Sequence, residues 1–238
     1  MKPIIVIPTY NERDNIATLV SQIFALRIPE LEIVVVDDNS PDKTAEVVEG
    51  MRADYPVHLV KRLRKLGLGS AYIAGFKKAL ALGADYIFEM DADFSHDPAD
   101  LPRLLSAAAD HDLAIGSRKI LGGKIVGWSL WRRLSSAGAM FFSRLLLGLR
   151  VRDVTAGFRC FRSQALKSIA LDTVKSNGYA FQEELLYRAE QAGFSIIEVP
   201  VVFNDRRRGR SKLSKKDIWE FFTVMYKLKF SRRPPATS

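Results

Sequence analysis

Cysteine is almost missing from this 238-residue chain, since Cys160 is the only one. A single thiol excludes an intrachain disulfide and a metal site built from several thiolates, and it fits a reducing compartment. We expect Cys160 to pack in the core. Histidine is also scarce, with three residues. The sequence shows no partner for His58, His96 or His111, so we assign them no catalytic role.

Long hydrophobic runs are absent as well. No stretch reaches the roughly 18 uninterrupted apolar residues of a membrane span, so we predict no transmembrane helix. The apolar start, residues 1–8, is too short for a signal peptide and is typical of a buried strand. The longest apolar stretch, residues 137–149, is interrupted by Ser143 and Arg144. A protein of this kind has to reach any membrane-embedded ligand from outside the bilayer.

Two phosphate-binding motifs are missing too. The chain has neither G-x-G-x-x-G nor G-x-x-x-x-G-K-[ST], which disfavours dehydrogenases and P-loop NTPases. What is present is an ordinary globular composition, with 47% hydrophobic and 26% charged residues. A chain of this length suits one large α/β domain, and we find no internal repeat and no linker.

Charge is divided unevenly along the chain. Through Arg118 there are 13 Lys and Arg against 18 Asp and Glu, a net of −5. From Lys119 onward there are 23 against 9, a net of +14. One half therefore suits a cation and the other suits anions. Nucleic acid, phosphorylated ligands and an anionic membrane surface are all candidate partners of the basic half.

Short buried strands alternate with helical patterns in the first half. We predict strands at residues 4–7, 32–36, 58–60, 86–90 and 113–115, and helices at 15–26, 44–51, 70–82 and 100–109. This alternation indicates a doubly wound, mostly parallel α/β sheet, with ligands at the carboxyl ends of the strands.

The second half has a different residue pattern. Residues 128–149 carry tryptophans, phenylalanines and leucines among arginines, which fits a helix or helix pair lying in a membrane interface, or packing against the domain. We predict a strand at 158–161, a helix at 179–191, a strand at 196–203 and a helix at 217–230. Pro200 inside the third of these indicates an edge or a bulge. Residues 231–238 form a tail that we expect to be disordered.

The sharpest motif is a pair of carboxylates, Asp91 and Asp93, directly after a predicted strand. Two such groups at a strand end can converge on Mg²⁺, which takes one or two protein carboxylates and fills its other positions with water and phosphate oxygens. A metal there would neutralise the charge that develops on a diphosphate leaving group. An acidic turn with a capping role is the competing interpretation of the pair by itself.

Two more polar loops follow the first and second predicted strands. Tyr10 could stack on a base, and Glu12 and Asp38 could accept hydrogen bonds from a base and a ribose. Turn formation alone explains Asp, Asn, Ser and Pro equally well at any one of these positions. Three acidic loops, each after a strand, favour a nucleotide site over three coincidental turns.

The motifs together resemble the dolichyl-phosphate mannosyltransferase (polyprenol monophosphomannose synthase) family of inverting glycosyltransferases with the A-type fold. The resemblance runs from about residue 3 to about residue 225, with its motifs in order. They are Pro8-Thr9-Tyr10-Asn11-Glu12, Asp37-Asp38-Asn39-Ser40-Pro41-Asp42, Lys65-Leu66-Gly67-Leu68-Gly69, Met90-Asp91-Ala92-Asp93, Gly116-Ser117-Arg118, Thr155-Ala156-Gly157-Phe158-Arg159 and Arg210-Ser211-Lys212-Leu213.

The resemblance implies transfer of mannose from GDP-mannose to a polyprenyl (dolichyl-type) phosphate with inversion, aided by Mg²⁺ or Mn²⁺. It implies a single glycosyltransferase domain at 1–230, with a nucleotide and metal half at 1–118 and an acceptor half with amphipathic helices at 119–230. It implies the following site residues: Pro8, Tyr10, Glu12, Val36 and Asp38 around the guanosine; Asp91 and Ala92 beside the donor; Asp93 on the metal; Arg118, Arg206 and Lys212 on phosphates; Arg132 and Ser136 on the acceptor phosphate. Some relatives have Gln where this chain has Ser95, whose hydroxyl is a poorer metal ligand, and we include Ser95 with Asp93 at the metal site.

These implications give the basic half a role. A phosphate monoester is ionised near neutral pH, so the enzyme needs no strong general base but has to bring two anions together. Arginine suits that task because its planar fork binds phosphate bidentately. We expect a peripheral protein on the cytoplasmic face of an anionic membrane, with small membrane-anchoring subunits as further partners and no nucleic acid.

Two alternatives stay open from the sequence. One is the same reaction with another sugar nucleotide, such as UDP-glucose. The other is a non-catalytic basic module that binds membranes or nucleic acid, which would not need Asp91, Asp93, Asp38 and Glu12 at strand ends.

Overall fold

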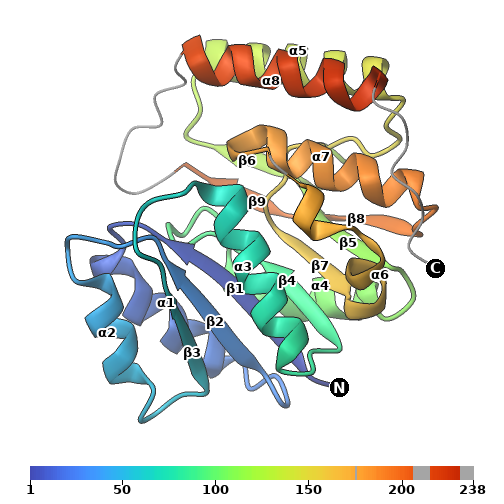
Figure 1. Cartoon of the computed structure of the whole chain (residues 1–238). Helices are drawn as coiled ribbons and strands as arrows, with labels where there is room; N and C mark the ends of the chain where they lie inside the picture. The colour runs from blue at the N-terminus through green and yellow to red at the C-terminus, as the bar shows by residue number, and fades with distance from the viewer. Residues whose placement is uncertain (175, 206–214, 231–238) are drawn as a thin grey trace.

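The computed structural model describes residues 1–174, 176–205 and 215–230 (Figure 1). Arg206 and Lys212, expected to contact phosphates, lie outside these residues. The tail expected over residues 231–238 lies outside them as well.

Seven strands form the main sheet in the order β3-β2-β1-β4-β7-β5-β8. Every neighbouring pair is parallel except those of β7, which runs antiparallel to β4 and β5. The mostly parallel α/β sheet expected from the sequence is confirmed. The strands are β1 (Pro3–Thr9), β2 (Glu32–Asp37), β3 (Val57–Lys61), β4 (Tyr86–Glu89), β5 (Leu113–Ser117), β7 (Arg159–Arg162) and β8 (Ile196–Pro200).

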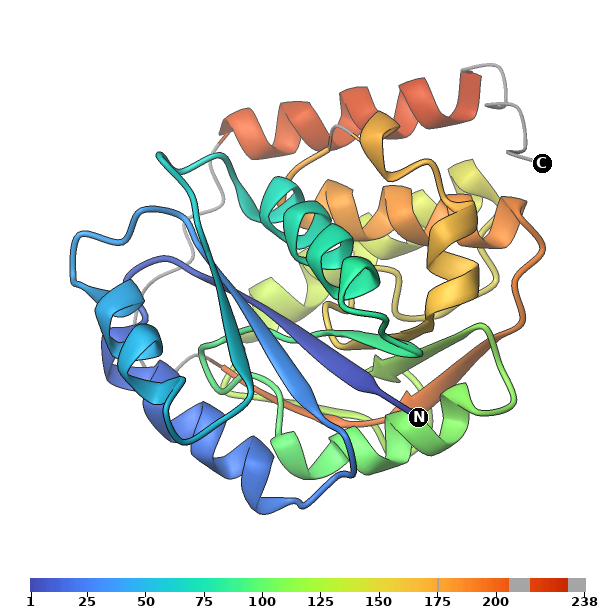
Figure 2. The same ribbon diagram turned by 60° about the horizontal axis from the view of Figure 1, so that its bottom comes forward.

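Helices cover both faces of this sheet because its central strands are apolar on both faces (Figure 2). In β1, Ile4 and Val6 belong to the core cluster that includes residues of α3 (Leu68–Ala81) and α7 (Gly178–Gln191). Ile5 and Ile7 belong to the cluster that includes residues of α1 (Arg13–Ala25), α2 (Thr44–Met51) and α4 (Leu101–Ala108). All four side chains are fully buried. The helices are α1 (Arg13–Ala25), α2 (Thr44–Met51), α3 (Leu68–Ala81), α4 (Leu101–Ala108), α6 (Ser163–Ser168) and α7 (Gly178–Gln191), with 3₁₀ turns at η1 (Pro98–Asp100) and η2 (Leu171–Thr173).

A second, two-stranded sheet pairs β6 (Lys124–Val126) with β9 (Val202–Asn204). The single strand expected over residues 196–203 is therefore wrong, because it is divided into β8 and β9. Pro200 ends β8, which is the last strand of the main sheet, so the predicted edge position of this proline is confirmed. Strand β6 was not predicted, since its three residues are too short to show a pattern.

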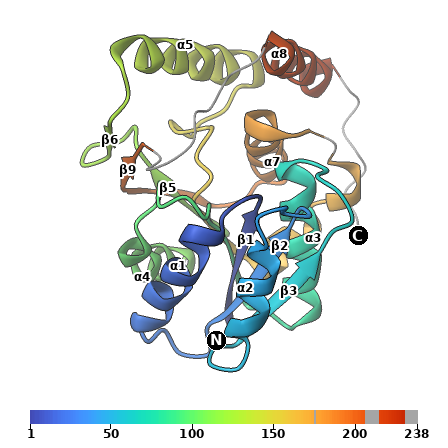
Figure 3. The same ribbon diagram turned by 90° about the vertical axis from the view of Figure 1, so that its left-hand side faces the viewer.

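The long helices α5 (Leu130–Leu147) and α8 (Lys215–Phe230) lie side by side on the outer side of α7 (Figures 1 and 3). The Phe142 ring of α5 meets the Phe222 ring of α8 edge to face, with centroids 5.3 Å apart. Met140 and Leu147 of α5 and Met225 of α8 anchor the pair in the core. Within the described parts of the chain, no helix is long and apolar enough to cross a bilayer.

Candidate active site

The site lies where the parallel strands β1, β2, β4 and β5 end and their loops begin, as expected for a doubly wound sheet. The first two loops are joined by hydrogen bonds. Asp37 accepts from the Thr9 hydroxyl at 3.0 Å and from the Ser40 amide at 2.9 Å. The Glu12 amide donates to the Thr44 hydroxyl at 3.0 Å. The structure thus brings together the two loops that we assigned to one nucleoside site.

Asp38 has a structural role that the sequence did not reveal. It is 5% exposed, and its Oδ2 accepts from the Leu66 amide at 3.1 Å and the Gly67 amide at 3.3 Å. Its Oδ1 lies 3.0 Å from Nη1 of Arg62. Asp38 thereby holds the 65–69 loop against the β2 end, and its expected bond to the nucleoside stays a prediction.

The loop that Asp38 holds brings Lys65 to Tyr10. The Lys65 ammonium lies 3.7 Å from the centroid of the Tyr10 ring, which is partly exposed. This cation–π contact covers one face of the ring. A base that stacks on Tyr10 would therefore displace Lys65 or use the opposite face.

The remaining residues expected around the guanosine differ in what they can offer. Pro8 is partly exposed, and Oε2 of Glu12 accepts from the Asn15 amide side chain at 2.7 Å. Val36 is fully buried among the core residues of α3. Any contact of Val36 with a nucleoside would therefore come from its backbone.

The acidic pair stands at the end of β4. The Tyr72 hydroxyl of α3 donates to Oδ1 of Asp91 at 3.0 Å, which fixes this carboxylate. Asp93 is 9% exposed, and its Oδ1 accepts from the Ser95 amide at 3.0 Å. Ala92 between them is buried in the core on the α1 and α4 side of the sheet. The two carboxylates are therefore held by different groups, Asp91 by a side chain of α3 and Asp93 by the backbone of its own turn.

The donor set around Asp93 fits a divalent metal that also binds a diphosphate. The hydroxyl of Ser95 is buried and has no hydrogen-bond partner among the described residues. It lies in the same turn as the Asp93 carboxylate, so both oxygens can serve one hard cation. Across the described ranges no group of three His, Cys, Asp or Glu side chains could hold a metal by itself.

Arg118 forms the most buried ion pair at the site. Its Nε and Nη2 donate to the two carboxylate oxygens of Asp153 at 2.7 and 2.6 Å, and Nη2 also donates to the Thr155 hydroxyl at 2.9 Å. Arg118 is 8% exposed and Asp153 is fully buried. This bidentate pair fixes the guanidinium plane at the end of β5. The sequence analysis missed Asp153, which no strand end or motif singled out.

Arg132 projects from the first turn of α5. Its Nη1 donates to both carboxylate oxygens of Asp205 at 2.9 and 3.0 Å, and its guanidinium lies 4.2 Å from the centroid of the Trp128 ring. Ser129 caps the helix by accepting from the Arg132 amide. Ser136 is partly exposed one turn further along, on the same side of α5 as Arg132.

A cavity of about 180 Å³ joins the acidic and basic groups. It brings Asp91 and Ser95 from the β4 loop together with Arg118 and Arg132. Ser136 and Asp93 do not line it. The full lining is Leu68, Asp91, Ser95, His96, Arg118, Trp128, Arg132, Thr155, Gly157, Gly178, Gln182 and Phe203.

His96 and Gln182 are cavity residues that the sequence analysis missed. His96 is 4% exposed, stacks on Phe158 at 4.9 Å, and places Nε2 3.9 Å from Oδ2 of Asp91. Burial, and then the charge of Arg118, lower the pKa of His96 to about 4, so its ring is neutral at pH 7. Gln182 is 3% exposed and begins a run of buried polar residues on α7, which is the signal that could have revealed it.

The other two histidines and the cysteine are not in the site. His58 pairs with Glu32 at 2.8 Å, and Nδ1 of His111 lies 3.0 Å from the Ala107 carbonyl oxygen. The expectation that Cys160 packs in the core is confirmed, because it is fully buried in β7.

Buried charged residues lie behind the cavity. Burial raises the pKa of Glu89 to about 7, although Arg159 opposes the shift from 3.9 Å away. Burial likewise raises the pKa of Glu183 to about 8. The Ser143 hydroxyl of α5 donates to Glu183 of α7 at 2.9 Å. A polar contact therefore ties the outer helix α5 to the helix that lines the cavity.

The comparison with known families decides where the chain belongs. Residues 4–170 match the family described as glycosyl transferase family 2. The chain belongs to glycosyl transferase family 2. The match covers the strand-end loops with Tyr10, Asp38, Asp91 and Asp93, together with Arg118 and Arg132. The resemblance drawn from the sequence motifs is confirmed.

The chain of this glycosyltransferase is similar to named enzymes over nearly its whole length. It is 43% identical to the undecaprenyl-phosphate mannosyltransferase of Micrococcus luteus, over 90% of this chain and 88% of the relative. It is 45% identical to the polyprenol monophosphomannose synthase of Mycolicibacterium smegmatis, over 92% of this chain and 83% of the relative.

Solved structures confirm the expected A-type glycosyltransferase fold. Glucosyl-3-phosphoglycerate synthase from Mycobacterium tuberculosis, solved with Mg²⁺ and UDP, superposes with a TM-score of 0.69 at 19% identity, over 94% of this chain and 79% of that one. The same enzyme was solved with Mn²⁺, UDP and its product, with a TM-score of 0.66 at 19% identity, over 95% of this chain and 77% of that one.

Proposed function

We propose that this glycosyltransferase moves mannose from GDP-mannose to a polyprenyl phosphate, with inversion at the anomeric carbon. The observation that carries the proposal is the cavity in which the Asp91 loop faces Arg118 and Arg132. An enzyme that joins two phosphate-bearing substrates needs an acidic side for the metal and a basic side for the second anion. The relatives named for undecaprenyl phosphate and polyprenol support the acceptor, and those named for mannose support the sugar.

The donor would lie along the ends of β1, β2 and β4. Tyr10, Glu12, Asp38 and the backbone of Val36, with Pro8, would surround the guanosine. Asp91, fixed by Tyr72, would accept hydrogen bonds from the sugar. Ala92 would lie beside the donor. Asp93 and Ser95 would hold Mg²⁺ or Mn²⁺ with the diphosphate. The metal would stabilise the charge on the departing GDP.

The acceptor phosphate would enter from the basic side. An oxygen of the phosphate attacks the anomeric carbon from the face opposite to GDP, while the bond between that carbon and the β-phosphate oxygen breaks and GDP leaves with the electron pair. The nucleophile is already ionised, so no side chain has to remove a proton. Arg118 and Arg132 would offset the repulsion between the two anions and align the attack, with Ser136 nearby on α5.

The fixed partners of these arginines sharpen that role. Arg118 is tied to Asp153 and Arg132 to Asp205, so neither guanidinium is a mobile surface cation. A preorganised cation lowers the barrier more than one that has to be ordered during the reaction. Arg206 and Lys212, outside the described residues, are proposed as further phosphate contacts. They follow Asp205 closely in the chain and belong to the half proposed for the acceptor, residues 119–230.

We also propose peripheral binding to the cytoplasmic face of a membrane. Helix α5 exposes large apolar side chains that a water-soluble surface would normally cover, and α8 continues this surface. Arginines among them are typical of a helix that lies in the membrane interface. The exposed residues are Leu130, Trp131, Leu134, Phe141, Phe142 and Leu145 of α5, with Phe222, Tyr226 and Phe230 of α8.

A transfer assay with radiolabelled sugar tests the reaction. Purified protein is mixed with polyprenyl phosphate in detergent, Mg²⁺ or Mn²⁺, and either GDP-mannose or UDP-glucose. We expect lipid-linked product from GDP-mannose with the divalent metal and none after chelation. Product from UDP-glucose alone would establish the other sugar nucleotide. No product from either donor, together with no metal-dependent thermal shift by GDP, would overturn the enzymatic proposal.

A further inference from the structure

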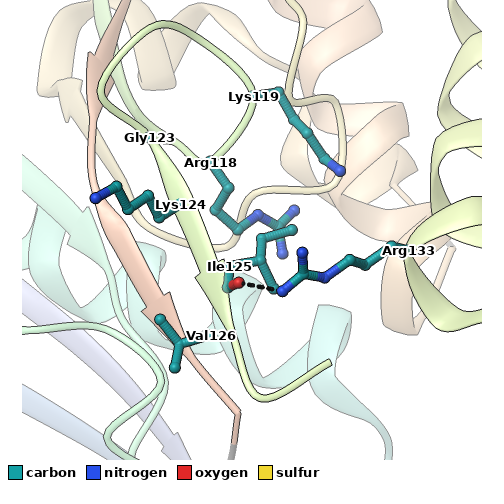
Figure 4. Close-up of a pocket in the computed structure, with 7 residues that line it drawn as sticks. All are labelled: Arg118, Lys119, Gly123, Lys124, Ile125, Val126 and Arg133. Carbon is teal, nitrogen blue, oxygen red and sulfur yellow. Dashed lines mark hydrogen bonds between the residues drawn. The ribbon is translucent and has the colours of Figure 1, made fainter. Parts of the chain in front are cut away.

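A basic pocket shares Arg118 with the active-site cavity, and the proposed reaction does not use its other residues. Figure 4 shows its lining. The pocket has a volume of about 430 Å³ and is lined by Arg118, Lys119, Gly123, Lys124, Ile125, Val126 and Arg133. Four of these seven residues are cations and none is an acid. Arg118 lines both cavities, so the new pocket is the neighbour of the acceptor side.

The cations come from separate elements that meet around the pocket. Lys119 follows β5, Lys124 begins β6, and Arg133 reaches down from the first turn of α5. Nη2 of Arg133 donates to the Ile125 carbonyl oxygen at 2.9 Å, which ties the helix to β6 (Figure 4). Within the described residues, no ion pair with an acidic side chain occurs at Lys119, Lys124 or Arg133. The pocket therefore carries positive charge that the described protein does not pair.

The loop between β5 and β6 packs closely against the backbone that carries the pocket cations Arg118 and Lys119. Gly123 donates to the Ile120 carbonyl in a tight turn, and a Cβ at Gly123 would lie 2.5 Å from the Ser117 carbonyl oxygen. Only glycine lets the turn lie so near the backbone before Lys119. Burial, with the repulsion of Arg118 and Arg133, lowers the pKa of Lys119 against the attraction of Asp153. A bound anion would relieve that repulsion.

Apolar side chains flank the pocket on both sides in the chain. Leu121, at the tip of the turn, is 96% exposed, and Trp131, two residues before Arg133, is 82% exposed. A free phosphate gives such side chains nothing to bury, and a nucleic acid could stack a base on Trp131 but would leave the aliphatic Leu121 in water. A bilayer satisfies both features, because its headgroups attract the cations and its acyl boundary accepts leucine and tryptophan.

We propose that this pocket, with Lys119, Lys124 and Arg133, binds the phosphate headgroup of an anionic bilayer lipid that is not the acceptor. The bound headgroup would hold the start of α5 at the membrane surface and thereby orient the adjoining cavity towards the acceptor lipid. The inference rests on the peripheral membrane binding proposed above, to which it adds the class of lipid and the residues that recognise it.

Vesicle sedimentation tests the proposal on the whole chain. Binding is measured with phosphatidylcholine vesicles and with vesicles in which phosphatidylglycerol replaces part of the phosphatidylcholine. We expect Lys119→Gln to weaken binding to the anionic vesicles about five-fold, and Lys119→Gln with Lys124→Gln about 25-fold. Binding to neutral vesicles should not change. Lys119→Arg keeps the charge, and Lys167→Gln removes an exposed charge from α6, so both should bind like the unmodified protein.

Each contrary result has a distinct meaning. Equal binding of the double variant and the unmodified protein to anionic vesicles would overturn the pocket. So would competition by inorganic phosphate as strong as that by anionic lipid, since it indicates a free-phosphate site. A raised KM for polyprenyl phosphate in detergent, with vesicle binding unchanged, would assign the pocket to the acceptor instead. If the unmodified protein bound neither kind of vesicle, the membrane proposal itself would fail along with this one, whereas transfer in detergent would be unaffected.

Discussion

The two halves of this glycosyltransferase treat apolar and charged side chains in opposite ways. The half that we propose for the donor, residues 1–118, buries its isoleucines and valines in the sheet and places carboxylates at the strand ends. The acceptor half exposes large apolar residues along α5 and α8 and surrounds them with cations. A metal-bound nucleotide is a water-soluble ligand, whereas a lipid phosphate is amphipathic. The proposed reaction accounts for this contrast, because it needs a separate surface for each substrate.

The two halves are alike at the cavity where they meet, because each fixes one lining side chain through a buried partner. Arg118 is held by the buried Asp153, and Asp91 is held by the buried Tyr72. Both contacts lie deep in the domain, although the side chains they fix line the same cavity. Both cavity side chains are therefore fixed from the core, while the surfaces proposed for the two substrates differ.

The largest effect should come from the acidic side. Asp93→Asn keeps the shape and a hydrogen-bond acceptor for the Ser95 amide but loses the charge that a metal needs. We expect metal-dependent transfer to fall roughly a thousand-fold or more, because the metal stabilises the leaving charge by several kcal/mol. Transfer rates and the melting temperature measure the change. Asp97→Asn, an exposed acid of the same loop, is the control and should keep its activity. Normal turnover of Asp93→Asn would remove this residue from the metal site.

The next largest effect should appear in the use of the acceptor and should leave donor binding unchanged. Arg132→Ala removes a guanidinium that we assign to the acceptor phosphate, and the loss of a charged hydrogen bond costs about 1.5–3 kcal/mol. We expect the KM for polyprenyl phosphate to rise roughly ten- to a hundred-fold, with the affinity for GDP unchanged. Arg150→Ala, an exposed cation just after α5, should change neither. Unchanged acceptor kinetics in Arg132→Ala would break the division into donor and acceptor sides.

A smaller effect, on vesicle binding, should distinguish an exposed apolar residue of α5 from one in residues 1–118. Trp131→Ala should weaken binding to vesicles about ten-fold, since burial of a large apolar side chain contributes about 1.5–3 kcal/mol. The melting temperature should not change, because Trp131 is 82% exposed. Leu63 is 96% exposed in the donor half, and Leu63→Ala should leave vesicle binding as it is. An equal loss in both variants would show that the membrane contact is not confined to α5 and α8.

The smallest effect concerns the contact between α5 and α7, and it depends on pH. Burial raises the pKa of Glu183 to about 8, so the folded protein keeps a proton that the unfolded chain releases above the ordinary value of 4.5. Stability therefore falls as the pH rises through this range. Glu183→Gln retains an acceptor for the Ser143 hydroxyl and removes the ionisation. Above pH 8, we expect the melting temperature of this variant to exceed that of the unmodified protein by about 5 °C.

Measuring the same difference well below pH 4.5 provides the control, because Glu183 is then protonated in both the folded and the unfolded chain. A gain that is equal at both pH values would show that packing, and not ionisation, is responsible.

Much of the candidate site follows from local patterns. Tyr10, Asp38, Asp91 and Asp93 were predicted because polar residues after apolar runs mark strand ends, and parallel strands end at one edge. Contacts between distant segments were not predictable in this way. Asp153 lies 35 residues from Arg118, and Glu183 lies 40 residues from Ser143, so no periodicity relates either pair. The antiparallel position of β7 between β4 and β5 was missed for the same reason.

The sequence by itself determined the alternation of strands and helices, the acidic loops, the charge division at Arg118 and the mixture of apolar and basic residues in the 128–149 region. Each of these features depends on the order of neighbouring residues, which can be read directly from the sequence. Only the tertiary structure decided that Asp38 supports a loop, that Val36 is buried, that His96 lines the cavity, and that four cations surround a second pocket. These features depend on which distant segments meet, and packing of the whole domain selects that arrangement.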